Sequence, residues 1–105
     1  ASTAEITYSI RDTEIDGIKI RKGDYMGIGD NGLLSTGPDL SEVTLNTVRS
    51  MMDEWSEIVT IYYGADTSSG DAEKIAEQLE EEFEDVSVEV TSGGQPVYYF
   101  IISVE

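Results

Sequence analysis

The sequence contains no cysteine and no histidine. A disulfide, a thiol nucleophile, a zinc site and an imidazole base are therefore all impossible within this chain. Most hydrolase and metalloenzyme mechanisms are excluded as well, because they depend on these groups. The absence of cysteine is also compatible with a cytoplasmic location, which we expect.

Basic residues are scarce, because six Lys and Arg stand against 22 Asp and Glu, which gives a net charge of −16. Residues 1–49 hold eight acids and five bases, a net −3, whereas residues 50–105 hold fourteen acids and one base, a net −13. Such a surface repels phosphate backbones and anionic lipids, so we expect no nucleic-acid partner and no peripheral membrane role. The acids either keep the surface solvated or steer a basic protein partner.

Long apolar runs are missing too. No stretch approaches the ~20 apolar residues that a membrane-spanning helix needs, so we expect no membrane insertion. The first residues lack the basic and apolar regions of a signal peptide. At 105 residues the chain has the length of one domain, and it does not start with Met. We therefore expect residues 1–105 to form a single domain of a longer multidomain protein.

Apolar and polar residues alternate in the first third of the chain, which indicates strands. In the first strand Ile6, Tyr8 and Ile10 share one face. Asp30-Asn31-Gly32 predicts a hairpin between the last two strands, because Asn and Gly tolerate positive φ. The expected strands are residues 5–11, 17–22, 24–29 and 33–36.

Two amphipathic helices are predicted after the break at Gly37-Pro38. Asp39 or Ser41 caps the first helix, which ends near Glu54. Ser69 or Asp71 caps the second. The expected buried stripes are Leu40, Val43, Thr47, Val48, Met51 and Trp55 in the first helix and Ala72, Ile75, Ala76, Leu79 and Phe83 in the second.

Three further strand-prone segments lie at residues 58–63, 86–91 and 97–104. The first is dense in β-branched and aromatic residues, which predicts a central strand covered on both faces. A turn at residues 92–96 predicts a hairpin between the other two. The order of elements predicts an α/β (α+β) two-layer sandwich, in which two main helices pack on a mixed, largely antiparallel sheet.

Two short motifs match known sites by letter only. Residues 27–32 fit the dinucleotide pattern G-x-G-x-x-G, but that site needs a helix directly after the last Gly, where a strand is expected. Residues 12–17 resemble the start of a calcium loop, yet the position of the closing Glu is Gly23, and strands flank the segment. A hairpin and a polar connection are the favoured interpretations.

Other residues leave two interpretations open. Arg11, Lys19, Arg21 and Lys22 either balance nearby acids or form a small basic spot that orients docking. The tyrosine pairs at residues 62–63 and 98–99 either pack on the sheet or lend one ring each to a binding surface. We expect no independent active site, because no base that could activate a nucleophile is evident.

Several segments, spread over nearly the whole chain, resemble the C-terminal domain of the fatty acid kinase A subunit, the dihydroxyacetone-kinase-related family of Gram-positive bacteria. The last segment is the most specific, because that family ends near such a sequence. The segments are Ile6-Thr7-Tyr8-Ser9-Ile10-Arg11-Asp12-Thr13, Gly23-Asp24-Tyr25-Met26-Gly27-Ile28, Ser56-Glu57-Ile58-Val59-Thr60-Ile61-Tyr62-Tyr63-Gly64, and Gly93-Gly94-Gln95-Pro96 leading into Ile101-Ile102-Ser103-Val104-Glu105.

The resemblance implies a division of labour. An N-terminal kinase domain, absent from this chain, binds ATP and magnesium, and the C-terminal region docks the DegV-like B subunit that presents the fatty acid. This chain would then hold no cofactor or metal and catalyse nothing alone. Its partners would be the DegV-like protein and the kinase and central domains of its own polypeptide, in the bacterial cytoplasm. The family pattern points to partner contacts at Arg11, Asp12, Gln95 and Tyr98.

From residue 58 onward the layout is also similar to the second domain of DegV-like fatty-acid-binding proteins. There a turn containing His helps to hold the lipid carboxylate, whereas the corresponding turn here, residues 92–96, has none. The similar layout gives an alternative function, a DegV-like module that binds an acyl chain in a pocket lined by Met26, Met51, Met52 and Phe100. A third possibility is an architectural one, in which an exposed apolar face covers a neighbouring domain.

Overall fold

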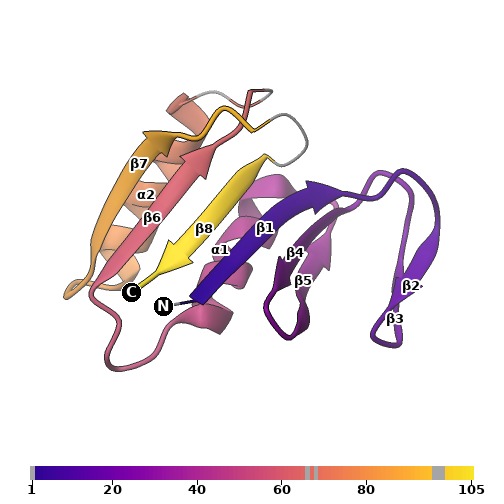
Figure 1. Cartoon of the computed structure of the whole chain (residues 1–105), viewed down its shortest axis with the longest axis horizontal. Coiled ribbons are helices and arrows are strands. Elements are labelled where there is room, and N and C mark those ends of the chain that lie inside the picture. The colour runs from indigo at the N-terminus through magenta and orange to yellow at the C-terminus, as the bar shows by residue number, and fades with distance from the viewer. Residues whose placement is uncertain (1, 66, 68, 96–98) are drawn as a thin grey trace.

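Six strands form one sheet in the order β5-β4-β1-β8-β6-β7, and helices α1 and α2 cover one of its faces (Figure 1). The computed structural model describes residues 2–65, 67, 69–95 and 99–105. A separate two-stranded sheet, β2–β3, stands beside the β4–β5 side of the molecule. The elements are β1 (Ser2–Tyr8), β2 (Thr13–Ile15), β3 (Ile18–Ile20), β4 (Tyr25–Gly29), β5 (Gly32–Gly37), α1 (Leu40–Met51), β6 (Ile58–Tyr63), α2 (Ser69–Glu82), β7 (Ser87–Ser92) and β8 (Phe100–Val104).

The sheet is mixed and largely antiparallel, as predicted. In the main sheet β6 and β7 pair in parallel through the crossover helix α2, and the other neighbouring strands pair antiparallel. The β4–β5 hairpin also forms as predicted. Gly27 and Gly29 belong to β4 and Gly32 to β5, so the G-x-G-x-x-G letters form a strand–turn–strand unit.

The core lies between the helices and one face of the sheet. Alternate residues of β1, β6 and β8 turn inward, and the buried stripes of α1 and α2 meet them. Thr44 and Thr47 of α1 are also buried, and their hydroxyls donate to the carbonyls of Leu40 and Val43. The buried cluster consists of Ala4, Ile6, Leu45, Val48, Val59, Ile61, Ala72, Ile75, Ala76, Leu79, Phe100, Ile102 and Val104.

Helix α1 begins where one of the two predicted caps places it. Asp39 is the N-cap, and its carboxylate accepts the Glu42 N–H at 3.0 Å. The helix ends at Met51, so the prediction that it reaches Glu54 was wrong. Trp55 was predicted to be in the buried stripe, but it lies beyond the helix and is 79% exposed. Helix α2 begins at Ser69, so both predicted caps, Ser69 and Asp71, are residues of its first turn.

Three strand predictions need correction. The first strand ends at Tyr8, and Ile10 lies outside it with 68% of its surface exposed. Strand β2 lies within residues 12–17, so the prediction that this segment is only a polar connection is wrong. Strand β6 is covered on one face only, since Ile58, Thr60 and Tyr62 stay partly exposed on the side away from the helices.

The predicted terminal hairpin does not form either. Strand β8 pairs with β1 and β6, and β7 pairs with β6 at the edge of the sheet. The side chains explain this order. Phe100, Ile102 and Val104 gain most from a central position, whereas the polar Ser87, Glu89 and Thr91 suit an edge. Residues 97 and 98 of the predicted last strand lie outside the described residues.

Candidate partner-binding surfaces

The β2–β3 sheet is an arm that holds two of the predicted contact residues at its base. The Asp12 carboxylate accepts the Lys22 N–H at 2.9 Å, and the Asp16 carboxylate accepts the Leu33 N–H at 2.8 Å, which fastens the tip of the arm to β5. Asp16 has φ of 53°, a conformation that Asp tolerates better than most residues. Asp12 therefore has a structural role, whatever else it contacts.

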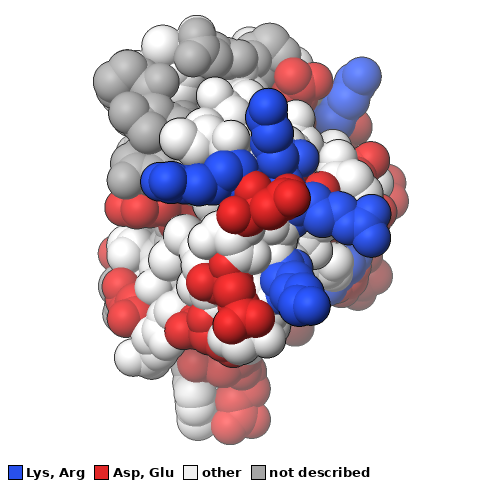
Figure 2. All heavy atoms as spheres, turned by 90° about the vertical axis from the view of Figure 1, so that its right-hand side faces the viewer, with Lys and Arg blue, Asp and Glu red and all other residues white. Residues whose placement is uncertain are grey.

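Four bases lie on or next to this arm. Figure 2 shows that side of the molecule, where Lys and Arg side chains gather with Asp and Glu among them. Arg11 is exposed; its carbonyl accepts a hydrogen bond from the Ser9 hydroxyl, and its side chain makes no hydrogen bond or ion pair within the described part of the chain. Ile10 and Ile18, 68% and 47% exposed, lie among these bases. The arm is thus a mixed-charge surface with two exposed apolar side chains.

The turn before β8 contains Gln95, the third predicted contact residue. Its side-chain N–H donates to the Tyr62 carbonyl at 3.0 Å, and its own carbonyl accepts the Ala65 N–H at 3.0 Å. These bonds tie the turn to the end of β6. Tyr98, the fourth predicted residue, lies outside the described residues. The structure does not bring Gln95 together with Arg11 and Asp12 in any described contact.

One member of the second tyrosine pair packs in an aromatic cluster. The Tyr99 ring lies 5.8 Å from that of Tyr8 and 5.5 Å from that of Tyr25, centroid to centroid. Tyr99 also packs against the main core, while Tyr8 is 44% exposed. Packing on the sheet, one of the two interpretations left open, therefore describes Tyr99.

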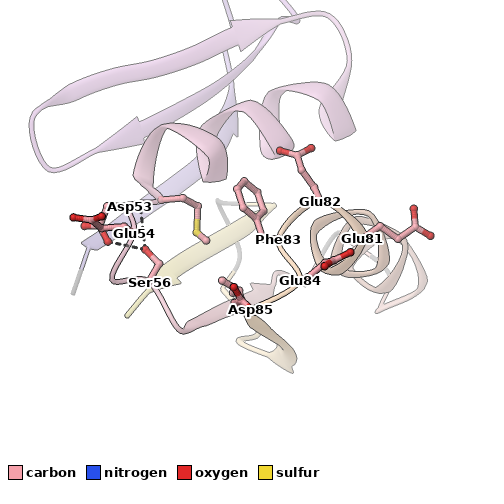
Figure 3. A pocket seen from close by; sticks show the side chains of 10 residues that line it. Asp53, Glu54, Ser56, Glu81, Glu82, Phe83, Glu84 and Asp85 are labelled. Atoms are coloured by element: carbon pink, nitrogen blue, oxygen red, sulfur yellow. Dashed lines mark hydrogen bonds between the residues drawn. The ribbon is translucent and has the colours of Figure 1, made fainter.

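An acidic groove opens where both helices end, and sequence reasoning missed it. Its volume is about 410 Å³. Figure 3 shows Phe83 between Ser56, which follows α1, and the acids Glu81 and Glu82 at the end of α2. The lining is three apolar residues, one serine and six acids, namely Met52, Phe83, Val86, Ser56, Asp53, Glu54, Glu81, Glu82, Glu84 and Asp85.

A short turn holds Trp55 between two residues that line this groove, Glu54 and Ser56. The Asp53 carboxylate accepts the Trp55 N–H at 2.8 Å, and the Asp53 N–H donates to Ser56 Oγ at 3.0 Å. Trp55 lies between two lining residues and is more exposed than Tyr8, Ile10 or Ile18. The sequence signal that could have located it is the Asp53-x-x-Ser56 turn, because it ends the helix before Trp55.

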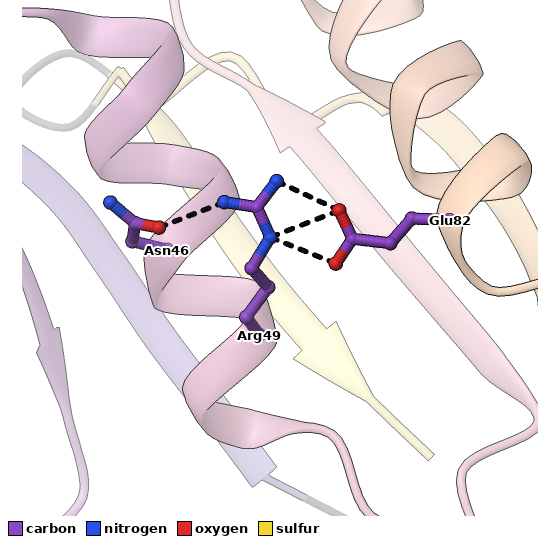
Figure 4. Close-up of polar contacts among 3 residues, drawn as sticks. All are labelled: Asn46, Arg49 and Glu82. Carbon is purple, nitrogen blue, oxygen red and sulfur yellow. Dashed lines mark hydrogen bonds and ion pairs between the residues drawn. The ribbon is translucent and has the colours of Figure 1, made fainter.

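One ion pair joins the two helices beside the groove. Arg49 of α1 donates from Nη2 to Glu82 Oε1 at 2.8 Å, with further bonds from Nε to the same carboxylate (Figure 4). These hydrogen bonds lower the pKa of Glu82 and raise that of Arg49.

Within the described ranges, no group of three or more Asp or Glu could hold a metal ion.

Comparisons with known proteins decide the family. A family model for the C-terminal part of proteins like the fatty acid kinase A subunit matches residues 1–105. This chain belongs to that family. It is 40% identical to Protein YloV of Bacillus subtilis (strain 168), 38% identical to an uncharacterized protein of Staphylococcus haemolyticus and 36% identical to one of Staphylococcus aureus (strain USA300). Each alignment covers 103 residues, which is 98% of this chain and 19% of the relative.

The predicted resemblance to the fatty acid kinase A subunit is therefore confirmed. The chain spans about a fifth of the length of the curated relatives that it matches. It is thus similar to one part of these relatives. No helix in the described part of the chain is long and apolar enough to cross a membrane.

The pocket proposed for an acyl chain does not unite its four residues. Ile6 pairs with both Phe100 and Gly27, so these three share the helix face of the sheet. Met26, next to Gly27, faces the other side. Met51 and Met52 line two different surface hollows. Met26 and Phe100 therefore cannot line one cavity between the sheet and the helices.

Proposed function

We propose that this chain is a non-catalytic docking domain of a fatty acid kinase A subunit. It binds a DegV-like B subunit loaded with fatty acid, so that the separate kinase domain can phosphorylate the acyl carboxylate. The kinase domain binds ATP and magnesium, and this domain positions the loaded partner relative to it. Both act in the bacterial cytoplasm.

Family membership over the full 105 residues is the observation that carries this proposal. The fold is consistent with it. Apolar side chains fill the space between helices and sheet, and the exposed Trp55 lies at the surface, where a protein partner can reach it. The four residues of the alternative acyl pocket lie apart, which favours docking over lipid binding by this domain.

The predicted contacts stay candidates within this proposal. Arg11 is the best placed, because its side chain is exposed and unpaired within the described residues. Asp12 and Gln95 already bind backbone groups, so substituting either would also disturb local structure. Tyr98 is a candidate on the family pattern alone.

Titration calorimetry tests the proposal directly. The 105-residue chain is titrated with a fatty-acid-loaded DegV-like protein from the same source at low and at moderate salt. We expect saturable binding that weakens as salt rises, because the chain has a net charge of −16. If neither condition gives measurable heat, with both proteins shown to be folded by circular dichroism, docking by this domain is wrong.

A further inference from the structure

Trp55 is the side chain whose exposure needs explaining. It is the only Trp of the chain, and 79% of its surface meets solvent. The bonds from Asp53 and Ser56 hold its backbone in a defined turn. Presenting a large aromatic on an ordered turn gives little to the fold. It does prepare a binding contact, since Trp is enriched among residues that dominate protein–protein affinity.

The groove beside Trp55 has an apolar floor. Met52, Phe83 and Val86 line it and also pack against the main core, so the floor is fixed by the fold. Apolar floor, fixed turn and exposed Trp together match the usual anatomy of a docking site, in which an apolar centre is surrounded by a polar rim.

The rim of the groove is negatively charged, although the dipoles of the helices that end there disfavour negative charge. The C-terminal end of a helix is the negative end of its dipole, where acids are destabilising and bases stabilising. Helix α2 nevertheless ends in Glu80, Glu81 and Glu82 and has no base in its last turn. Arg49 offsets only Glu82. The remaining acids therefore lower stability where they stand, which is expected of residues kept for binding.

We propose that the groove at the ends of α1 and α2, together with Trp55 in the turn between two of its lining residues, docks a protein surface that presents Lys and Arg around an apolar recess. The inference rests on the proposed function and takes the DegV-like protein as the partner. Charge selects this surface over the β2–β3 arm. On the arm Arg11, Lys19, Arg21 and Lys22 are balanced by Asp12, Glu14, Asp16 and Asp24, whereas six acids and no base line the groove.

The first test removes the aromatic ring. Trp55→Ala is compared with Ile10→Ala, which truncates another highly exposed side chain on the arm. Both variants should keep the melting temperature of the parent chain, because both side chains are mostly solvated. We expect Trp55→Ala to weaken binding of the DegV-like protein at least about tenfold, and Ile10→Ala to leave the affinity within about twofold.

The second test separates binding from stability. The pair Glu81→Gln and Glu84→Gln is compared with Glu5→Gln and Glu89→Gln, which remove the same charge from the open face of the sheet. The groove pair should raise the melting temperature, because it relieves the negative end of α2, and should still slow association and weaken affinity several-fold. If these acids only keep the surface solvated, the groove pair would raise the melting temperature without weakening binding of the DegV-like protein.

A third measurement follows Trp55 itself. The chain is labelled with 5-fluorotryptophan, which gives a single fluorine resonance because there is one Trp. We expect the resonance to shift when the DegV-like protein is added. Normal binding by the parent and by both groove variants, with an unmoved resonance, would overturn the groove and leave the proposed function standing. No binding by the folded parent chain would overturn both.

Discussion

Gly27 is where helix α1 comes closest to the sheet. A Cβ at this position would collide with the Thr47 side chain, including its Cβ and Cγ2. Thr47 is fully buried, and its hydroxyl is bound to the Val43 carbonyl, so it has little room to move. Gly27 therefore sets the distance between α1 and β4, and the first Gly of the G-x-G-x-x-G letters has a packing role.

We predict that Gly27→Ala destabilises the domain by about 1–3 kcal/mol, the usual cost of overpacking a filled core. Gly37→Ala is the matched control, because its Cβ would lie 3.6 Å from Val43 Cγ2, an ordinary contact. It should change stability by no more than about 1 kcal/mol. Urea unfolding followed by circular dichroism measures both. Equal losses in the two variants would show that the close approach to Thr47 is not the cause.

At the scale of elements, Arg49 and Glu82 join α1 to α2. Figure 4 shows the guanidinium of Arg49 between Asn46 of its own helix and Glu82 of the other. Nη1 donates to Asn46 Oδ1 at 2.8 Å, while Nε and Nη2 hold the carboxylate. Both charged side chains are about 40% exposed, so water screens the pair. Its fixed bidentate geometry still makes it sensitive to protonation.

The pair predicts a specific pH dependence. Because hydrogen bonds from Arg49 lower the pKa of Glu82 below 4.5, the folded state favours the carboxylate. The stabilisation is complete above the unfolded pKa and is lost as pH falls through the folded one. Arg49→Met should therefore lower the free energy of unfolding at pH 7 and lose that difference from the parent as the pH falls through the lowered pKa of Glu82.

The comparison with the parent matters because many other acids titrate in the same range. Arg21→Met is the control, since it also removes one base, but from the arm, where no described ion pair exists. In urea unfolding, the difference in the free energy of unfolding between Arg21→Met and the parent should not shrink in this way between pH 7 and pH 3. A constant difference for Arg49→Met across that range would contradict a role for the ion pair.

The local sequence pattern predicts most helices and strands. The order of the strands in the sheet depends on pairing between distant segments, and it could not be predicted in this way. The stripe from Ala72 to Leu79 has helical spacing, and the run Ile58–Tyr63 is dense in β-branched and aromatic residues, so the helix and the strand could be predicted from the sequence. The place of β8 between β1 and β6 depends on competition among strands distant in sequence, which no local window contains. Of the groove, only its acidity was visible, because Trp55 was assigned to a helix that in fact ends at Met51.

At the scale of the whole molecule, charge is distributed unevenly along the chain, and the fold brings part of it together in the groove. Residues 50–105 have a net charge of −13, and six of their acids line the groove. Like charges in this arrangement repel one another, which raises the free energy of the compact state. Ions at about 0.1 M screen this repulsion beyond a Debye length of about 10 Å.

Salt should therefore act with opposite sign on stability and on docking. Raising NaCl from about 0.01 M to about 0.15 M should increase the melting temperature, by roughly 4–8 °C if the repulsion removed is about 1 kcal/mol. The same change should weaken binding of the DegV-like protein, because screening also removes its attraction to the groove. A chain with Glu80, Glu81 and Glu84 changed to Gln should respond less in both measurements. A melting temperature that falls with salt would contradict the repulsion, whereas binding that strengthens with salt would contradict a basic partner.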